Sequence, residues 1–210
     1  MILLLVQQEL TNTARFALWK VEEPLSFFLT QTPYDEAYFT AIHHPEKQLE
    51  FGASRYLAAQ LSQQASKALI HKHPNRMPYF TQLGLQVSLS HTHGLVAAIV
   101  SADYPVGIDV EKINERMLRI RKRFIHDVEL PMHLPESEEQ QIARCWCIKE
   151  AVFKWLQESN ITFITDFVIE KWEHEAATVK ISTPKTRQQV VVQSALWMDY
   201  AYAYCFEAHR

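Results

Sequence analysis

The first segment whose residue types could perform chemistry is a short run that places two acids in an apolar setting. Residues 106–112 read VGIDVEK, and their valines and isoleucine alternate with Gly107, Asp109 and Glu111. Alternation with a period of two predicts a β-strand, so the two carboxylates share one face. A glycine inside an apolar strand often marks a place where another backbone approaches closely. The alternative is the outer face of an edge strand, where paired acids are common.

A second segment, residues 146–154, reads WCIKEAVFK and is typical of a helix. Glu150 and Lys154 are four residues apart, so they lie on the same side of that helix. Apolar and aromatic residues occupy most other positions, and we therefore expect the helix to be buried nearly all round. Buried charges need partners, so Lys149, Glu150 and Lys154 must each meet a counter-charge or a ligand. The simpler alternative is an ion pair between Glu150 and Lys154 on a solvated helix.

The acids of the two segments, Asp109, Glu111 and Glu150, resemble an oxygen-ligand site for a hard divalent cation such as Mg²⁺ or Mn²⁺. Mg²⁺ keeps waters and phosphate oxygens when it binds, so three carboxylates are sufficient. Lysines beside such a site suit a phosphorylated substrate. The chain has only four glycines and no Gly-rich phosphate loop, which argues against a P-loop nucleotide hydrolase.

Other candidate ligand-binding residues lie outside these segments. Ser90 and His91 end a predicted strand; a histidine there is more often structural than a ligand, and zinc binding with His93 lacks a third ligand at close spacing. Arg55 lies on a predicted helix with apolar neighbours, where a salt bridge between the halves of the chain is the alternative to ligand binding. Residues 116–123 include five basic side chains, which form either a solvated helix face or a patch for an acidic partner.

The composition is that of a soluble globular protein, because 48% of its 210 residues are hydrophobic and 21% are charged. The formal net charge of -3 argues against a protein whose overall charge attracts nucleic acid or another polyanion. Three cysteines without disulfide or metal-ligand spacing favour a reducing cytoplasm. Residues 2–6 lack a basic region and a cleavage site, so we expect a buried strand there and not a signal peptide. No stretch is long enough to span a bilayer.

The order of predicted elements indicates an α+β fold of two similar halves, residues 1–103 and 104–210. We expect helices at 24–30, 34–42, 45–61, 116–123 and 138–157, and loops at 71–78 and 131–139. We expect strands at 2–6, 14–21, 87–94, 95–101, 106–112, 167–172, 177–181, 188–196 and 200–206.

These motifs, in this order, resemble the 4′-phosphopantetheinyl transferases, specifically the long, two-lobed type typified by the surfactin-synthetase activator. The family patterns G-[IV]-D-x-E and W-x-x-K-E-[AS]-x-x-K stand here at residues 107–111 and 146–154. A third pattern, S-H-[ST], stands at residues 90–92. Each motif alone is weak, but their joint occurrence is highly specific. The resemblance implies two α/β lobes related by pseudo-twofold symmetry.

The resemblance also implies a reaction, in which the phosphopantetheine arm of coenzyme A passes to a serine of an apo carrier protein and 3′,5′-adenosine bisphosphate is released. In that reaction Asp109, Glu111 and Glu150 would hold Mg²⁺ on the pyrophosphate. Glu150 would also be the base for the serine hydroxyl, a weak nucleophile that needs one. Lys149 and Lys154 would pair with the pyrophosphate.

Four residues of the first half are implied in coenzyme binding. His91, together with Ser90, would lie near the 3′-phosphate or the pyrophosphate, and Arg55 would approach the nucleotide end. Many family members carry G-[KR]-P before the S-H-[ST] turn, whereas residues 75–78 here read NRMP, so the basic residue is one place earlier and the glycine is replaced. We predict that Arg76 nevertheless contacts coenzyme A.

The implied partners are coenzyme A and an apo acyl or peptidyl carrier protein, with a monomeric enzyme that binds neither nucleic acid nor membrane. The type of carrier, from fatty-acid, polyketide or peptide synthesis, is left open by the sequence. Two alternative functions are a non-catalytic binding module and an Mg²⁺-dependent hydrolase of phosphoanhydrides. The presence of all three acids and both motif lysines argues against a binding module without catalysis.

Overall fold

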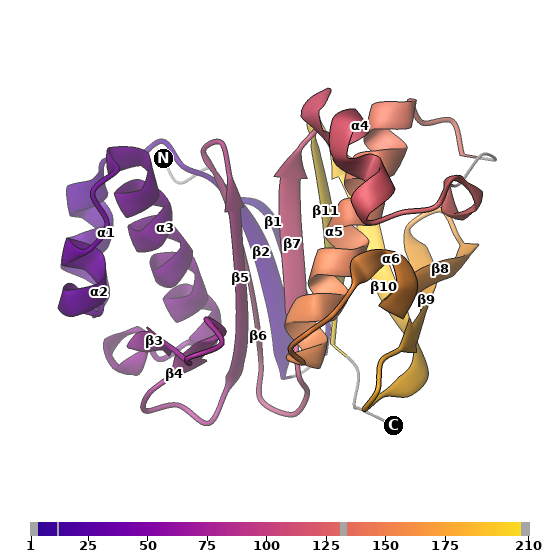
Figure 1. The fold of residues 1–210 in the computed structure, drawn as a ribbon. Helices are drawn as coiled ribbons and strands as arrows, with labels where there is room; N and C mark the ends of the chain where they lie inside the picture. Colours follow the sequence, from indigo (N-terminus) through magenta and orange to yellow (C-terminus); the bar gives the residue numbers. More distant parts are fainter. Residues whose placement is uncertain (1–3, 12, 131–133, 207–210) are drawn as a thin grey trace. The chain divides into compact units, whose positions relative to one another are not determined.

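The structure is a computed structural model that describes residues 4–11, 13–130 and 134–206, with the backbone only for residues 4–8. The chain divides into two compact units, Met1–Val106 and Gly107–Arg210 (Figure 1). The sequence predicted this boundary after residue 103. The mixture of helices with antiparallel sheets confirms the α+β class at this level.

The first unit is built on a four-stranded antiparallel sheet in the order β1-β2-β6-β5, with helices on one face (Figure 1). Its strands and helices are β1 (Leu4–Glu9), β2 (Ala14–Lys20), α1 (Leu25–Gln31), α2 (Glu36–Thr40), α3 (Pro45–Ser62), η1 (Ala65–Lys67), β3 (Ile70–Lys72), β4 (Pro78–Phe80), β5 (Gln86–Thr92) and β6 (Leu95–Ser101). The short strands β3 and β4 form a separate hairpin.

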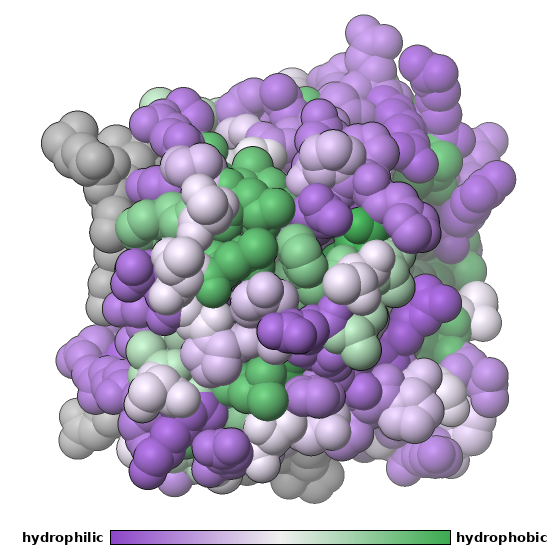
Figure 2. Space-filling model, turned by 90° about the vertical axis from the view of Figure 1, so that its left-hand side faces the viewer, coloured by the Kyte–Doolittle hydropathy of each residue, from purple (hydrophilic) through white to green (hydrophobic). Residues whose placement is uncertain are grey.

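Helix α3 is the core helix of the first unit. Pro45 occupies its first turn, where no intrahelical N–H is required, and Gln63 ends it in the left-handed conformation with φ of 57°. Gly52 lets α1 pack closely, since a Cβ on Gly52 would lie 3.1 Å from Phe28 Cβ. On the helix-bearing side of this unit, hydrophobic side chains gather at the centre of the surface and hydrophilic ones surround them (Figure 2).

The second unit has a five-stranded antiparallel sheet in the order β7-β11-β10-β9-β8, with the long helix α5 packed on it. Its elements are β7 (Gly107–Lys112), α4 (Arg116–Ile120), η2 (Arg121–Arg123), η3 (Asp127–Glu129), α5 (Glu138–Leu156), α6 (Phe163–Asp166), β8 (Phe167–Trp172), β9 (Ala176–Ser182), β10 (Arg187–Trp197) and β11 (Tyr200–Cys205).

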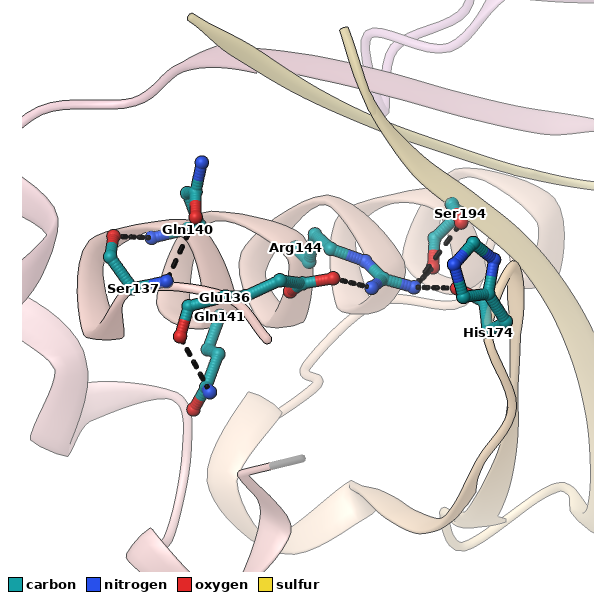
Figure 3. A network of polar contacts seen from close by, with 7 residues as sticks. All are labelled: Glu136, Ser137, Gln140, Gln141, Arg144, His174 and Ser194. Atoms are coloured by element: carbon teal, nitrogen blue, oxygen red, sulfur yellow. Dashed lines mark hydrogen bonds and ion pairs between the residues drawn. The ribbon is translucent and has the colours of Figure 1, made fainter. Parts of the chain in front are cut away.

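Helix α5 begins at a capping box and is then held by a buried arginine. Ser137 Oγ accepts from the Gln140 N–H, and the Gln140 side chain accepts from the Ser137 N–H. Arg144 is 1% exposed; it forms an ion pair with Glu136 and donates to Ser194 Oγ at 2.8 Å (Figure 3). Arg144 also donates to the His174 carbonyl, so one side chain ties α5 to two other segments.

The two units share a connection pattern around their long helices. In the first unit, the strand before α3, β2, pairs with the last strand, β6, which pairs with β5. In the second, the strand before α5, β7, pairs with the last strand, β11, which pairs with β10. All of these pairings are antiparallel. Each unit therefore packs a long helix on a sheet in which these three strands have the same connectivity.

The structure differs from the sequence prediction in two local details. The predicted loop at 71–78 is a hairpin, because Ile70–Lys72 pairs with Pro78–Phe80 and only the intervening residues turn. The predicted basic helix at 116–123 ends at Ile120 and continues as a 3₁₀ turn. Among the described ranges, no helix combines the length and apolar composition needed to cross a membrane.

Candidate functional site

Strand β7 and helix α5 make an unusually close backbone contact. A Cβ built on Gly107 would lie 1.9 Å from the Ala151 carbonyl oxygen and 2.8 Å from the Trp155 nitrogen. No side chain fits there, which confirms that Gly107 marks a close backbone approach. Because residues alternate along a strand, Asp109 and Glu111 project from the same face as Gly107, toward α5.

Lys154 on α5 reaches β7 directly. Its Nζ lies 2.6 Å from Asp109 Oδ1 and 3.0 Å from the Ile108 carbonyl oxygen. Burial opposes the charged lysine, but Asp109 and Glu150 outweigh it and raise the pKa of Lys154 above its ordinary value. Asp109 is 4% exposed, so this ion pair is shielded from water and is not the solvated helix pair considered as an alternative.

Glu150 lies beside this ion pair and has a strongly altered acidity. Burial raises its pKa to about 7, the negative charges of Asp109 and Glu111 add to the effect, and Lys154 opposes it. A carboxyl group with a pKa near neutrality can accept a proton at physiological pH and release it again. The structure therefore brings Asp109, Glu150 and Lys154 together in the second unit, with Glu111 within electrostatic reach.

The same acids could hold a divalent cation, because three carboxylates that repel one another gain from a positive charge among them. Their oxygens are the donors that Mg²⁺ and Mn²⁺ prefer. As the side chains stand, however, no group of three or more His, Cys, Asp or Glu residues in the described part of the chain has metal-binding geometry. The donor set nevertheless fits the metal.

Lys149, predicted to pair with the pyrophosphate, has a different role in the structure. Its side chain is 0% exposed, and its Nζ lies 2.9 Å from Glu129 Oε2. The same ammonium group donates to the carbonyl oxygens of Phe124 and Phe163, at 2.6 and 3.3 Å. We correct the prediction accordingly, because an ammonium group with these three partners and no exposed surface is not available to a phosphate.

In the first unit, Arg55 is buried against aromatic rings. Its guanidinium carbon lies 3.5 Å from the centre of the Phe51 ring and 5.9 Å from that of Tyr38. It donates to the Phe51 carbonyl at 3.3 Å, and its Nε has no hydrogen-bond partner among the described residues. Burial lowers the pKa of Arg55 to about 10, with Tyr38 and Asp35 opposing, so the cation is costly to bury and suited to an incoming anion.

Two further cations lie near the same tyrosine. Lys72 Nζ lies 3.0 Å from the Tyr38 hydroxyl oxygen and 4.9 Å from the centre of its ring. The hydrogen bond from Lys72 lowers the pKa of Tyr38, and the charges of Arg55 and Arg76 contribute. Arg76 is exposed and has φ of 69° in the β3–β4 connection. Arg55, Lys72 and Arg76 therefore form a cationic cluster around one aromatic side chain.

His91 is held by an acid of α3. Its Nδ1 lies 3.1 Å from Glu50 Oε2, which also accepts from Lys47 Nζ at 2.7 Å. The His91 side chain is 39% exposed, whereas Ser90 is buried. Consecutive residues of a strand point to opposite faces. The Ser90 and His91 side chains therefore lie on opposite faces of β5. A joint contact of both side chains with one phosphate would require them to lie on the same face.

Two protein-family models match this chain, one in each unit. The family model described as "4'-phosphopantetheinyl transferase superfamily" matches residues 105–205, which cover the strand β7 and helix α5 motifs. The model described as "4'-phosphopantetheinyl transferase N-terminal domain" matches residues 35–101, which include Arg55 and the S-H-T motif at the end of β5. The chain belongs to the 4′-phosphopantetheinyl transferase superfamily.

A curated relative within this superfamily is the 4'-phosphopantetheinyl transferase gsp of Aneurinibacillus migulanus. It is 25% identical over 154 residues, which are 72% of this chain and 63% of the relative. The match thus spans less than two thirds of the relative's length. The long type of phosphopantetheinyl transferase is nevertheless supported by the presence of both family regions in one chain.

Glu129 and Lys72 are among the residues of these sites that the sequence did not identify. Glu129, the buried partner of Lys149, lies in a stretch with no periodic signal; the one available clue was that a buried lysine needs an acid. Lys72 lies in the segment predicted to be a loop, and only the hairpin places it against Tyr38. Both depend on contacts between residues that are distant in the sequence.

Proposed function

We propose that this phosphopantetheinyl transferase moves the 4′-phosphopantetheine arm of coenzyme A to a serine of an apo carrier protein. The serine oxygen bonds to the phosphorus that carries the pantetheine, and the bond from that phosphorus to the bridging oxygen breaks. The electron pair leaves with 3′,5′-adenosine bisphosphate, and the serine proton passes to a base. Both products are thereby accounted for without a further reactant.

One observation carries the proposal: Lys154 Nζ lies 2.6 Å from Asp109 Oδ1, and Glu150, one helix turn before Lys154, lies within electrostatic reach of both side chains. A serine hydroxyl needs a nearby base, and an acid whose pKa is near neutrality fits that task. Lys154, held on β7 by two acceptors, is the cation best placed to neutralise charge on the departing pyrophosphate oxygens. We assign Glu150 as the base and Lys154 as the electrostatic partner.

We further propose that Asp109, Glu111 and Glu150 hold Mg²⁺, with Mn²⁺ as a substitute. When bound, the ion would stabilise the negative charge that develops on the bridging oxygen as the leaving group departs. The support is the donor set, together with the negative charges of Asp109 and Glu111, which add to the effect of burial in raising the pKa of Glu150. Asp109 would contact both the metal and Lys154, because a carboxylate has two oxygens and each can bind one cation.

For the nucleotide end of coenzyme A, we propose the cationic cluster of the first unit. Arg55 and Arg76 keep their predicted assignment, and Lys72 joins them because it reaches the same tyrosine. Phosphate groups are well matched by arginine and lysine, and the Tyr38 ring, 40% exposed, offers a surface for stacking. His91 stays a candidate for a coenzyme phosphate through its exposed imidazole, and Ser90 a candidate through its backbone.

The experiment that tests this function is intact-mass analysis of an apo carrier protein incubated with the enzyme, coenzyme A and Mg²⁺. We expect one phosphopantetheine added per carrier, no addition when the carrier serine is changed to alanine, and no addition in excess EDTA. Consumption of coenzyme A without modification of any carrier protein would instead support the phosphoanhydride hydrolase. Unmodified carrier together with intact coenzyme A would support the binding module.

The remaining details of the proposal concern the setting of the enzyme. We propose a monomer in a reducing cytoplasm, with acyl and peptidyl carrier proteins as alternative partners and no binding to nucleic acid or membrane. The pseudo-twofold relation between the lobes stays a prediction; what the units have in common is that each pairs the strand before its long helix with its last strand. Sedimentation analysis tests the monomeric state, and assays with acyl and peptidyl carrier proteins test the choice of partner.

A further inference from the structure

The three cysteines of the chain lie in the core of the second unit and have no part in the reaction proposed above. Cys145 and Cys147 belong to α5, Cys205 belongs to β11, and all three are buried as thiols. A buried thiol is ordinarily an inert, small apolar side chain. Two of these three nevertheless make polar contacts that the third does not make, and those contacts lie beside the proposed site.

Cys147 and Cys205 bond helix α5 and strand β11 to each other in both directions. Cys147 Sγ on the helix donates to the Ala201 carbonyl oxygen on the strand, at 3.3 Å. Cys205 Sγ on the strand donates to the Ala151 carbonyl oxygen on the helix, at 3.5 Å. The bonded residues are four apart on each element, so the two bonds bracket about one turn of α5.

The segment of β11 that these bonds join to the helix also pairs with the acidic part of β7. The paired residues of the two strands are Ala201 with Glu111, Ala203 with Asp109, and Cys205 with Gly107. The Ala151 oxygen that accepts from Cys205 is also the atom that Gly107 approaches closely. Three elements are therefore tied in a closed set: β7 to β11 by the strand ladder, β11 to α5 by the thiols, and α5 to β7 by the ion pair of Lys154.

The thiols suit this role because they are small and stay protonated. Burial raises the pKa of the Cys147 thiol well above its ordinary value, and the negative charges of Asp109 and Glu111 add to the effect. A protonated thiol keeps the S–H donor that the contact with a carbonyl oxygen needs. The neighbouring residues Ala151 and Ala201 are both 0% exposed, so small side chains let helix and strand come close enough for sulfur to reach the backbone.

We infer that Cys147 and Cys205 are positioning residues of the transferase site. By fastening α5 to β11, the two thiols set where Glu150 lies relative to Asp109 and Glu111. They act through backbone carbonyl oxygens and not on a substrate. This assignment rests on the proposed function, because it concerns the arrangement of the acids proposed for that reaction. A displacement of about 1 Å among such groups can lower a rate by about 100-fold.

Cys145 provides an internal control for burial. It lies two residues before Cys147 on the same helix, and both residues are 0% exposed. Its thiol forms no hydrogen bond with another residue that the structure describes. Alanine removes the same sulfur atom at positions 145, 147 and 205. A donor between α5 and β11 is lost only at positions 147 and 205.

The test replaces each of the three cysteines by alanine and, separately, by serine, which keeps a donor. For every protein we would measure kcat, the KM for coenzyme A and the KM for an apo carrier protein, with circular dichroism as the check on folding. Amide hydrogen exchange in residues 147–155 and 200–205, followed by mass spectrometry, reports the fastening of helix to strand without any substrate.

We expect Cys147→Ala and Cys205→Ala to lower kcat by about tenfold, with both KM values within about twofold of the parent. Hydrogen exchange in residues 147–155 should become several-fold faster in both variants. Serine should restore kcat and slow exchange at these positions, because its hydroxyl donates to the same carbonyl oxygen. At Cys145, alanine should leave kcat and exchange unchanged, and serine should bring no gain.

Two results would overturn the assignment. One is an equal kcat for Cys147→Ala and Cys145→Ala, because the loss would then follow from burial alone. The other is a serine variant at position 147 or 205 that is no better than its alanine counterpart. If an alanine variant unfolds, the serine variants decide: activity near that of the parent supports the positioning role, and lost activity refutes it.

Hydrogen exchange separates this assignment from the proposed function. A parent enzyme that modifies no carrier protein refutes the transfer reaction. The thiols are then judged by exchange alone: faster exchange in Cys147→Ala and Cys205→Ala than in Cys145→Ala supports the fastening, and equal exchange refutes it. A parent that modifies the carrier, with all three alanine variants matching it in kcat, keeps the function and refutes the positioning role.

Discussion

Gly107 and the carbonyl oxygen of Ala151 approach so closely that a Cβ on Gly107 would lie 1.9 Å from that oxygen. The contact joins the strand that bears Asp109 to the helix that bears Glu150 and Lys154. Any side chain at this position must push the two elements apart. The spacing of the catalytic candidates therefore depends on a residue that has no functional group.

Gly107→Ala should destabilise the second unit and reduce activity together. Overpacking of a tight contact typically costs about 1–3 kcal/mol, and the contact here involves backbone atoms that cannot rotate away. Urea denaturation and a carrier-modification assay measure the two effects. Gly84→Ala is the matched control, because a Cβ there meets nothing within 4 Å. Equal unfolding free energies for the two variants would show that β7 and α5 can separate without cost.

Asp109→Asn should remove most of the activity while it keeps the shape of the side chain. The amide loses both the charge that Lys154 contacts and the proposed metal ligand, and loss of several kcal/mol of transition-state stabilisation corresponds to about 100-fold or more in kcat/KM. Glu139→Gln, which changes a partly exposed acid in the first turn of α5, is the control. Similar rates for both variants would remove Asp109 from the site.

Lys149→Met should act on stability rather than on coenzyme binding. The change leaves the buried Glu129 carboxylate without its cation, which typically costs about 3–5 kcal/mol. The double variant Lys149→Met/Glu129→Leu should recover part of that loss. Urea denaturation and the KM for coenzyme A decide between the roles. A raised KM with an unchanged free energy of unfolding would restore the assignment of Lys149 to the pyrophosphate.

Glu50 should make the first unit sensitive to acid. Burial by itself raises the pKa of Glu50, but hydrogen bonds from His91 and Lys47 outweigh it and lower the pKa from 4.5 to about 2. A lowered pKa in the folded state gives stability that is present above pH 4.5 and is lost as the pH falls toward 2. The melting temperature of the parent should therefore drop over that window by more than that of Glu50→Gln. Glu46→Gln, an exposed acid of the same helix, should follow the parent.

Arg144→Ala should be among the most destabilising changes in the second unit. It would leave Glu136 without its partner and remove the donors to Ser194 and His174, a loss of about 3–5 kcal/mol for a broken buried pair. Arg187→Ala on the exposed side of β10 should change stability by about 0.5 kcal/mol or less. Denaturation midpoints compare the two, and matching values would show that the Arg144 network contributes nothing.

The sequence by itself determined the family and identified residues that we propose for the chemistry. Local patterns were sufficient because they are properties of short segments: the alternation at residues 106–112 places Asp109 and Glu111 on one face, and the spacing of four places Glu150 and Lys154 on one side of a helix. The role of Gly107 also followed from its place in a strand. Each of these conclusions depends only on backbone periodicity.

Only the tertiary structure decided which buried charged side chains form ion pairs with each other. Lys149 and Lys154 lie five residues apart on one helix, yet one meets Glu129 in the core and the other meets Asp109 on β7. No local pattern distinguishes them, because each partner comes from a separate segment brought close by packing. The same holds for Lys72, which reaches Tyr38 only through the β3–β4 hairpin. The pairing of buried charges that are distant in the sequence is set by the packing of whole helices and strands, and hydrophobic periodicity does not predict it.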